Sequence, residues 1–451
     1  MSVETLDAVD QAAGTGQRRR YALCGLSSRG LSLFALPLLG NSAESDLSAH
    51  GELVAILDID EERVASFNER VAAAPVPFYR PDDFDRMVRE TRPDVVLVAS
   101  PDHTHADYTV RALRHGIDVI TEKPMSATCE QVRAMVRAEQ ESPASIRVAH
   151  NFRYPARHRQ IKQMLIDGLV GRITSVDYVW SLDTYHGASY FNRWNRQREY
   201  SGGLSIHKGS HHFDLINWWL DDIPEQVFGY GARNYYGADS PHNPSKRDGV
   251  DYSVAEQRQR CPYFQRWLGD GDIPEDDHLS PRTGSYDLPY AVQYPADKPM
   301  YLYDGEIDVE DSYSAVVRYR RGASLSYSVT FSAPWEGYRV GINGTHGRIE
   351  TAYYDFREHE QPPADSQTVV YYPMFGPRQV RDAANSAGTH GGADPLIRRE
   401  LFVGETEESR RLSMAADSRQ GAYAVAVGEA LWRSVRDNRP YTIRELLGDI
   451  D

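Results

Sequence analysis

Cysteine is scarce in this sequence: Cys24, Cys129 and Cys261 are the only three in 451 residues, with no CxxC pattern. So few and so widely spaced, they exclude a disulfide framework and a cysteine zinc site, and they fit a reducing compartment. No apolar run reaches the length of a transmembrane helix. The arginines at 18–20 precede a strand and turn pattern instead of the apolar segment of an export signal. We therefore expect a cytoplasmic protein.

The sequence has fewer basic than acidic residues: 50 lysines and arginines compared with 65 aspartates and glutamates, which gives a formal net charge of −15. This balance argues against non-specific binding to nucleic acid or to an anionic membrane surface. The hydrophobic content of 41% and charged content of 25% are ordinary for a globular protein. The length allows two or three domains with sizeable cores.

Short apolar runs alternate with helical patterns in the first third of the chain, after a polar segment, residues 1–18, that we expect to be disordered. The apolar runs lie at 21–24, 53–57, 95–99, 118–121 and 146–149. Strands that alternate with helices predict an α/β domain, here over residues 19–150, with a doubly wound parallel sheet.

A glycine turn follows the first predicted strand and has G-x-G-x-x-G spacing, except that a serine holds the middle position. In dinucleotide-binding domains such a turn lets the backbone approach a pyrophosphate. A serine can still offer its amide and hydroxyl, although the backbone comes less close. Taken alone, the match favours an ordinary turn between a strand and a helix. Its candidate cofactor-binding residues are Gly25, Ser27, Ser28, Arg29 and Gly30.

An acid stands at the tip of the second predicted strand. Asp58 lies about where a carboxylate binds the adenosine ribose in such domains. Ile59 follows it, where an NADP-binding protein would have a serine or arginine for the 2′-phosphate. The pattern predicts NAD as cofactor in preference to NADP. The alternative is that Asp58 caps the following helix.

Two further strand ends carry polar residues that we expect at the same edge of the sheet. Ser100, Pro101, His103 and His105 follow one strand. Glu122 and Lys123 follow the next, just before a proline that ends the strand and restricts the lysine to extended geometry. Ligands bind at this carboxyl edge in open α/β sheets. The alternatives are structural histidines and a surface lysine beside a turn.

The pattern changes after residue 155. A helix at 156–167 precedes an alternating strand, and hairpin patterns at 313–332 and 339–354 predict an antiparallel sheet. Residues 237–305 have little periodicity, and a stretch of that length suggests a lid or a subunit-contact arm.

His207 and His211 lie four residues apart, with Asp214 three residues further, so on one helix all three would share a face. Such histidines serve acid/base chemistry, share a metal, or simply belong to an amphipathic helix. We expect no metal, because no glutamate accompanies them as in H-E-x-x-H.

The glycine turn, Asp58, the S-P-x-x-x-H run ending at His105 and the E-K-P run at 122–124 resemble the Gfo/Idh/MocA family of glucose–fructose oxidoreductases, inositol dehydrogenases and rhizopine-catabolism proteins. This resemblance implies a Rossmann domain that binds a nicotinamide cofactor. It implies a second domain over residues 151–451 with an open, mostly antiparallel sheet that carries substrate contacts and joins a homodimer or homotetramer. Residues 237–305 have no clear counterpart.

The resemblance also implies a site. The segment from 202 to 214 resembles the family motif G-G-x-L-x-D-x-x-x-H-x-x-D, with His211 in the histidine position and His207 where the aspartate is expected. The implied catalytic residues are Lys123, His207 and His211. Further implied contacts are Asn151 and Glu122 to the cofactor, and Arg153, Tyr154, Lys208 and His390 to the substrate. His390 begins a segment, 390–395, that resembles a family loop facing the substrate cleft.

These features predict an NAD-dependent oxidoreductase that transfers a hydride between nicotinamide and a secondary hydroxyl of a sugar, cyclitol or glycoside. Lys123 would stabilise the developing alkoxide and His211 would act as general acid/base, with His207 orienting it or sharing its proton. One alternative is an NAD-assisted glycoside hydrolase or lyase that works by transient oxidation and elimination. Another is a non-catalytic sensor, which has no need of Lys123 or His211.

Overall fold

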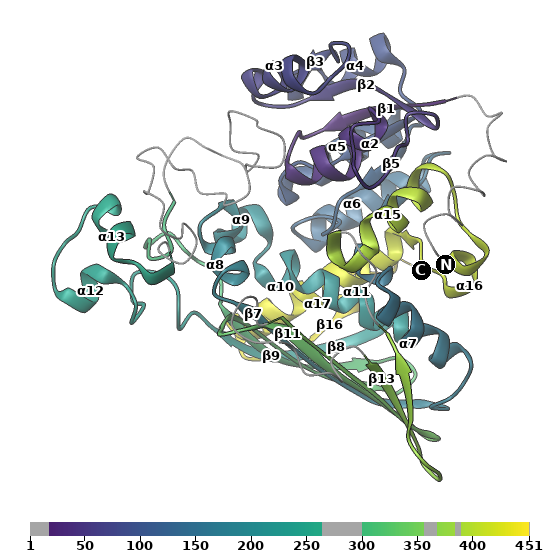
Figure 1. Cartoon of the computed structure of the whole chain (residues 1–451), viewed down its shortest axis with the longest axis vertical. Coiled ribbons are helices and arrows are strands. Elements are labelled where there is room, and N and C mark those ends of the chain that lie inside the picture. The colour runs from purple at the N-terminus through teal and green to yellow at the C-terminus, as the bar shows by residue number, and fades with distance from the viewer. Residues whose placement is uncertain (1–17, 264–299, 356–367, 384–388, 451) are drawn as a thin grey trace.

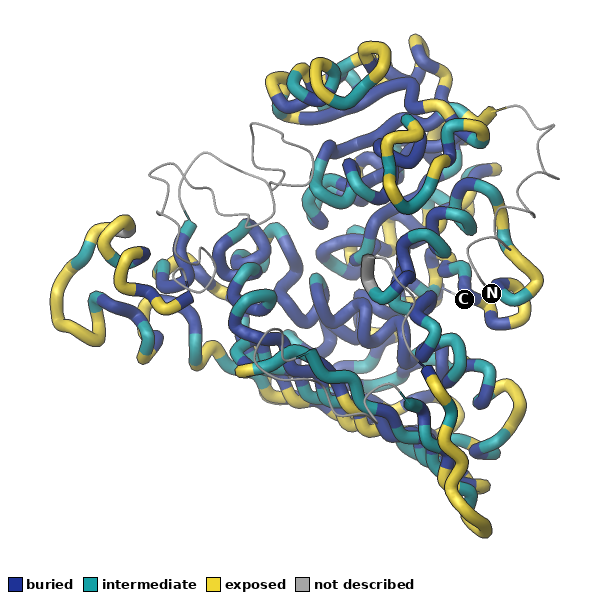
Figure 2. The backbone as a smooth tube through the Cα atoms, viewed as in Figure 1, coloured by how far each residue is buried: buried dark blue, intermediate teal, exposed yellow. Residues whose placement is uncertain are grey.

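The computed structural model describes residues 18–263, 300–355, 368–383 and 389–450 (Figure 1). Two sheets organise it, one of seven strands and one of nine, with a layer of helices between them. Figure 2 shows that buried residues concentrate in the strands of the upper sheet and in this helical layer, whereas the outer face of the lower sheet is largely exposed.

The seven-stranded sheet has the order β15-β6-β5-β4-β1-β2-β3 and is parallel between β6 and β3. The prediction of a doubly wound parallel sheet is confirmed. Its strands are β1 (Arg19–Cys24), β2 (Gly51–Leu57), β3 (Phe78–Tyr79), β4 (Val95–Val98), β5 (Asp118–Thr121) and β6 (Ile146–Val148). The helical segments between them are η1 (Gly30–Ala35), α2 (Leu36–Leu38), α3 (Glu61–Arg70), η2 (Pro81–Asp83), α4 (Phe84–Thr91), η3 (Asp102–Thr104), α5 (His105–Arg114) and α6 (Cys129–Gln140).

The nine-stranded sheet has the order β14-β13-β12-β11-β7-β10-β9-β8-β16 and is antiparallel except where β7 meets β10. The prediction of a mostly antiparallel sheet is confirmed. Burial alternates along β9 and β10, so one face packs against helices and the other faces outward. Its strands are β7 (Ile173–Asp183), β8 (Pro224–Ala232), β9 (Ser312–Tyr319), β10 (Ser324–Ala333), β11 (Glu336–Gly344), β12 (Gly347–Asp355), β13 (Thr368–Pro373), β14 (Gln379–Asp382) and β16 (Tyr441–Thr442).

Helices from the second half of the chain cover this sheet and reach the first one. Strand β15 (Ala416–Asp417) pairs antiparallel with β6, and Asp417 then caps α17 through the backbone N–H of Gln420. The remaining helices are η4 (Asn151–Arg153), α7 (Ala156–Ile166), α8 (His186–Phe191), η5 (Trp194–Arg196), α9 (Arg198–Ser201), α10 (Leu204–His207), α11 (Gly209–Leu220), α12 (Pro244–Asp248), α13 (Val254–Arg260), α15 (Thr389–Phe402), α16 (Glu407–Leu412), α17 (Ser418–Asp437) and α18 (Ile443–Leu447).

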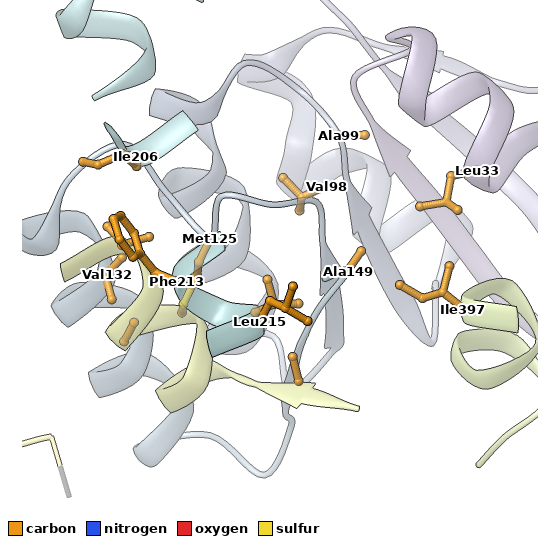
Figure 3. Close-up of a cluster of buried hydrophobic side chains, with 14 of the residues drawn as sticks. Leu33, Val98, Ala99, Met125, Val132, Ala149, Ile206, Phe213, Leu215 and Ile397 are labelled. Atoms are coloured by element: carbon orange, nitrogen blue, oxygen red, sulfur yellow. The ribbon is translucent and has the colours of Figure 1, made fainter. Parts of the chain in front are cut away.

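One apolar core joins the two halves. Figure 3 shows Ala149, which follows β6, beside Ile397 of α15, and Met125 near Phe213 of α11. Continuous packing of this kind fixes the sheets relative to one another, so side chains from both can form one site. Within the described ranges, no helix is long and apolar enough to cross a membrane.

Three predicted features differ from the structure or lie outside it. The single helix expected to carry His207 and His211 is two helices, α10 and α11. The predicted loop at 390–395 is part of α15. In the segment 237–305 the structure describes α12 and α13, whereas residues 264–299 lie outside the described residues, as do residues 1–17.

Candidate functional site

A cavity of about 280 Å³ lies where the carboxyl ends of β1, β4 and β5 face α8, η5 and α10. Its position is the sheet edge at which the sequence places its polar strand ends. Of the residues predicted from the sequence, those that line it are Ser27, Ser28, Arg29, Ser100, Pro101, His105, Glu122, Lys123 and His207.

The glycine turn packs directly against the end of β4. Gly25 has a φ of +95°, and a Cβ there would come within 2.6 Å of the Ser100 backbone. A Cβ at Gly30 would come within 2.3 Å of the Gly25 carbonyl oxygen. The middle serine is tied into the turn, because Ser27 Oγ donates to the Ala99 carbonyl at 2.6 Å and accepts from the Gly30 N–H at 3.1 Å. The turn is thus tight and open toward the cavity on one side.

Asp58 is buried and braces this turn. Its Oδ2 accepts from the Leu26 N–H at 2.8 Å and its Oδ1 from the Asp60 N–H at 3.0 Å. Asp60, not Asp58, caps α3, through the Arg63 N–H. The helix-cap alternative for Asp58 is therefore wrong, and Ile59 beside it is exposed.

The two histidines predicted after β4, His103 and His105, have different surroundings. His105 is buried, with Nε2 at 2.8 Å from the Ser100 carbonyl and Nδ1 at 3.0 Å from the Pro124 carbonyl, so it ties the end of β4 to the turn after β5. His103 lies against the Tyr200 ring, with centroids 5.0 Å apart, and does not line the cavity.

Lys123 reaches the cavity from the end of β5. Burial lowers the pKa of its ammonium, while the charges of Glu122 and Asp102 act in the opposite direction. Glu122 itself is engaged elsewhere: its Oε1 accepts from Arg29 Nε at 3.0 Å and its Oε2 from the Lys123 backbone N–H at 3.1 Å. Arg29 in turn donates to Asp394 of α15 at 2.9 Å. The side-chain ammonium of Lys123 donates no hydrogen bond to any residue that the structure describes.

Asp102 is a site residue that sequence reasoning missed. Its Oδ2 lies 2.5 Å from His207 Nδ1, and Asn195 Nδ2 lies 3.1 Å from His207 Nε2. Burial raises the pKa of Asp102 to about 7 and lowers the pKa of His207 well below its ordinary value. Because burial opposes charge on both groups, the pair holds one proton between its two facing atoms near neutral pH.

His211 does not line the cavity. Its ring lies against Phe152 with centroids 4.4 Å apart, and burial, followed by the charges of Lys123 and Lys208, lowers its pKa well below the ordinary value. Asp214 pairs with Arg153, which donates to it at 2.5 and 2.8 Å. The predicted common face of 207, 211 and 214 is wrong, because α10 ends at His207.

The other predicted substrate and cofactor residues do not line the cavity. Lys208 Nζ lies over the rings of Trp180 and Phe152, at 5.1 and 5.3 Å, and burial lowers its pKa to about 8. Asn151 donates to Asp394 at 3.2 Å, and Tyr154 donates to Glu400 at 2.8 Å. The side chain of His390 lies outside the described residues.

Besides Asp102 and Asn195, the sequence patterns did not identify five lining residues: Ala99, next to Ser100, and four within 186–194, namely His186, Tyr190, Arg193 and Trp194. The segment 186–194 carries no motif, and only its fold against β10 and α10 brings it to the cavity. In the described part of the chain, no group of three or more His, Cys, Asp or Glu side chains could hold a metal ion.

Two family models match most of the chain. The model for "Oxidoreductase family, NAD-binding Rossmann fold" matches residues 19–150, and the one for "Oxidoreductase family, C-terminal alpha/beta domain" matches residues 162–443. Both describe the Gfo/Idh/MocA family.

Among individual proteins, "Putative oxidoreductase YteT" of Bacillus subtilis is 45% identical over 434 residues, which is 95% of this chain and 98% of that one. Inositol 2-dehydrogenase of Rubrobacter xylanophilus is 28% identical over 182 residues, 39% of this chain and 47% of that one. The crystal structure of the WlbA dehydrogenase of Bordetella pertussis, in complex with NADH and UDP-GlcNAcA, has the same fold, with a TM-score of 0.61, 19% identity, and coverage of 94% and 99%. This chain is a member of the Gfo/Idh/MocA oxidoreductase family, and its first domain is the NAD-binding Rossmann domain of that family.

Proposed function

We propose that this protein catalyses the NAD-dependent oxidation of a secondary hydroxyl of a sugar, cyclitol or glycoside, or the reverse reduction. The observation that carries the proposal is Lys123: a half-buried lysine, without a hydrogen-bonded partner among the described residues, in a cavity between the glycine turn and the second domain. Relatives named inositol 2-dehydrogenase and 1,5-anhydro-D-fructose reductase support this class of substrate.

The residues present fit a dinucleotide. The turn at Gly25 leaves no room for a Cβ, and Ser27, Ser28 and Arg29 of this turn line the cavity, where a pyrophosphate would lie. Asp58 directly follows β2, the position from which a carboxylate accepts a hydrogen bond from the ribose 2′-hydroxyl in Rossmann domains. When bound, NAD supplies the acceptor for the hydride.

The side chains supply the proton chemistry. Burial lowers the pKa of Lys123. As an amine, Lys123 takes up the proton of the substrate hydroxyl, and the ammonium that results stabilises the developing alkoxide. The Asp102–His207 pair holds one proton beside it and exchanges it with the lysine. Glu122 and Arg29 hold the backbone of Lys123 in place through their ion pair.

Turnover of a panel of sugars, cyclitols and glycosides with NAD tests the proposal, with NADH absorbance as the readout. We expect NADH to form with at least one member of the panel. Binding without turnover across the panel would instead favour a sensor.

The NAD-assisted hydrolase or lyase remains a second candidate, because elimination needs a proton acceptor near the neighbouring carbon, and the Asp102–His207 pair supplies one besides Lys123. A relative named 2,7-anhydro-N-acetylneuraminate hydratase, 27% identical over 146 residues, supports it. Product analysis decides: cleaved glycoside without net NADH favours this candidate, and net NADH without cleavage excludes it.

We expect a preference for NAD over NADP of about tenfold or more in kcat/KM, because a carboxylate at the ribose repels a 2′-phosphate and such like-charge contacts cost several kcal/mol. Comparing kcat/KM for both cofactors with one substrate measures it. Asp58→Asn should lower the ratio of kcat/KM with NAD to kcat/KM with NADP, because it raises kcat/KM with NADP. A clear NADP preference in the wild type would contradict the ribose assignment.

We further propose that the outer face of the nine-stranded sheet joins subunits into a homodimer or homotetramer. Tyr230 and Val316 are exposed there beside Phe228, which is paired with Val316 across β8 and β9. Sedimentation velocity should show Val316→Asp shifted to a smaller species, with exposed Val250→Asp as the control. The same species for the wild type and Val316→Asp would remove this face from assembly.

A further inference from the structure

Arg193 is a cation of the cavity that the proposed chemistry does not use. It lies between α8 and η5, where Nε donates to the Ser189 carbonyl at 2.8 Å and Nη2 to Ser189 Oγ at 2.7 Å. Its guanidinium carbon lies 5.3 Å from the centroid of the Tyr190 ring. These contacts fix the plane of the guanidinium and leave Nη1 without a hydrogen bond to any residue described in the structure.

Neighbouring arginines differ from it in one respect: each has a carboxylate. Arg29 pairs with Glu122 and Asp394, whereas Arg196 pairs with Asp304 and Glu306. Within the described ranges, no carboxylate lies at ion-pair distance from Arg193. Burial lowers the pKa of its guanidinium, with the Tyr190 hydroxyl acting in the opposite direction.

The surrounding groups do not supply the missing anion. The acids nearest the site are engaged, since Asp102 contacts His207, Glu122 pairs with Arg29, and Glu336 lies 2.8 Å from His186. The positive charge of Arg193 also lowers the pKa values of Lys123, His186 and His207. The cavity therefore has an excess of positive charge on the side formed by the second domain.

An oriented guanidinium with a free edge matches the planar geometry of a carboxylate, and charge-assisted bonds of this kind are strong where water is excluded. The glycine turn on the opposite wall is the place for the cofactor's phosphates. The anion that Arg193 faces would then belong to the second ligand of the cavity.

We propose that Arg193 binds the carboxylate of an acidic sugar, so that the substrate is a uronic acid or a glycoside that carries one. This inference rests on the proposed oxidoreductase function and narrows its substrate class. Arg193 would bind the substrate at a distance from the reacting carbon, and Lys123 would act on the hydroxyl that is oxidised.

The test compares matched sugars in the full-length protein with NAD: D-glucuronate with D-glucose, and D-galacturonate with D-galactose, as free sugars and as methyl glycosides. We expect kcat/KM for an acid to exceed that for its neutral partner by about tenfold or more, the usual effect of a charge-assisted hydrogen bond. Arg193→Gln should abolish this preference through KM, so that an acid and its neutral partner have equal kcat/KM in the variant. Arg193→Lys should retain part of it.

Arg89→Gln, an exposed change on α4, controls for the loss of one positive charge. Equal preference in the wild type and Arg193→Gln would overturn the inference while leaving the oxidoreductase function intact. A rise in the KM for NAD alone would also overturn it, by assigning Arg193 to the cofactor. If no sugar is turned over, the oxidoreductase function fails, and calorimetry with D-glucuronate decides the subsite: binding that Arg193→Gln removes supports it, and no binding refutes it.

Discussion

Lys123→Ala is expected to lower kcat by about a hundredfold or more, because the lysine is proposed both to stabilise the alkoxide and to accept its proton. The affinity for NAD should change little, since the glycine turn and Asp58 hold the cofactor in the proposed site. Steady-state kinetics, together with cofactor binding measured by fluorescence quenching, would separate the two effects.

Lys123→Arg should not restore turnover, because a guanidinium keeps its proton at working pH. Lys162→Met is the matched control: burial lowers the pKa of Lys162 to about 8, but this lysine donates to the Trp218 carbonyl, away from the cavity. Activity within a few-fold of wild type in either Lys123 variant would remove this lysine from the mechanism.

The features predicted correctly from the sequence are those that local patterns determine. Strand ends carry their polar residues to one edge of a parallel sheet whatever the rest of the chain does, so the positions of Lys123, Ser100 and the glycine turn followed from strand order. Asp58 was placed at that edge too, although its bond to the Leu26 N–H depends on how the turn folds back.

The pairing of Asp102 with His207 could not be predicted in this way. It joins residues 105 positions apart, and it depends on where α10 meets the end of β4. Helical periodicity instead predicts that His207 lies beside His211 and Asp214, because it assumes one regular helix through 207–214. The His211 N–H instead bonds to the Lys208 carbonyl, three residues back, which tightens the chain between α10 and α11 and turns His211 toward Phe152.

The same pairing also changes the interpretation of the departure from the family motif. His207 stands where the motif has an aspartate, and Asp102 places a carboxylate against it from the other domain. We propose that the site thereby keeps a carboxylate near Lys123, now shared with an imidazole. The proton acceptor would be this pair, in place of His211.

The pH dependence of kcat/KM follows from that pair. Oxidation requires the form that can accept a proton, so activity should fall as the pH drops below about 7, the pKa to which burial raises Asp102. Reduction requires the protonated form, so it should lose activity above the same pH. Because the titrations of Asp102 and His207 are coupled, the pH at the midpoint of this change in activity is a property of the pair and not of either residue.

Asp102→Asn should remove the acidic limb of the pH profile, that is, the fall in oxidation below about pH 7. It should also lower kcat/KM for oxidation by about a hundredfold, the usual contribution of general acid–base catalysis. His207→Asp should move the acidic limb upward, because two carboxylates in contact would share one proton and one of them would ionise only at higher pH. Asp107→Asn, an exposed change on α5, is the control. The measurement is kcat/KM against pH for the wild type and all three variants. An acidic limb in Asp102→Asn identical to that of the wild type would assign the titration to another group and leave Asp102 a positioning residue for His207.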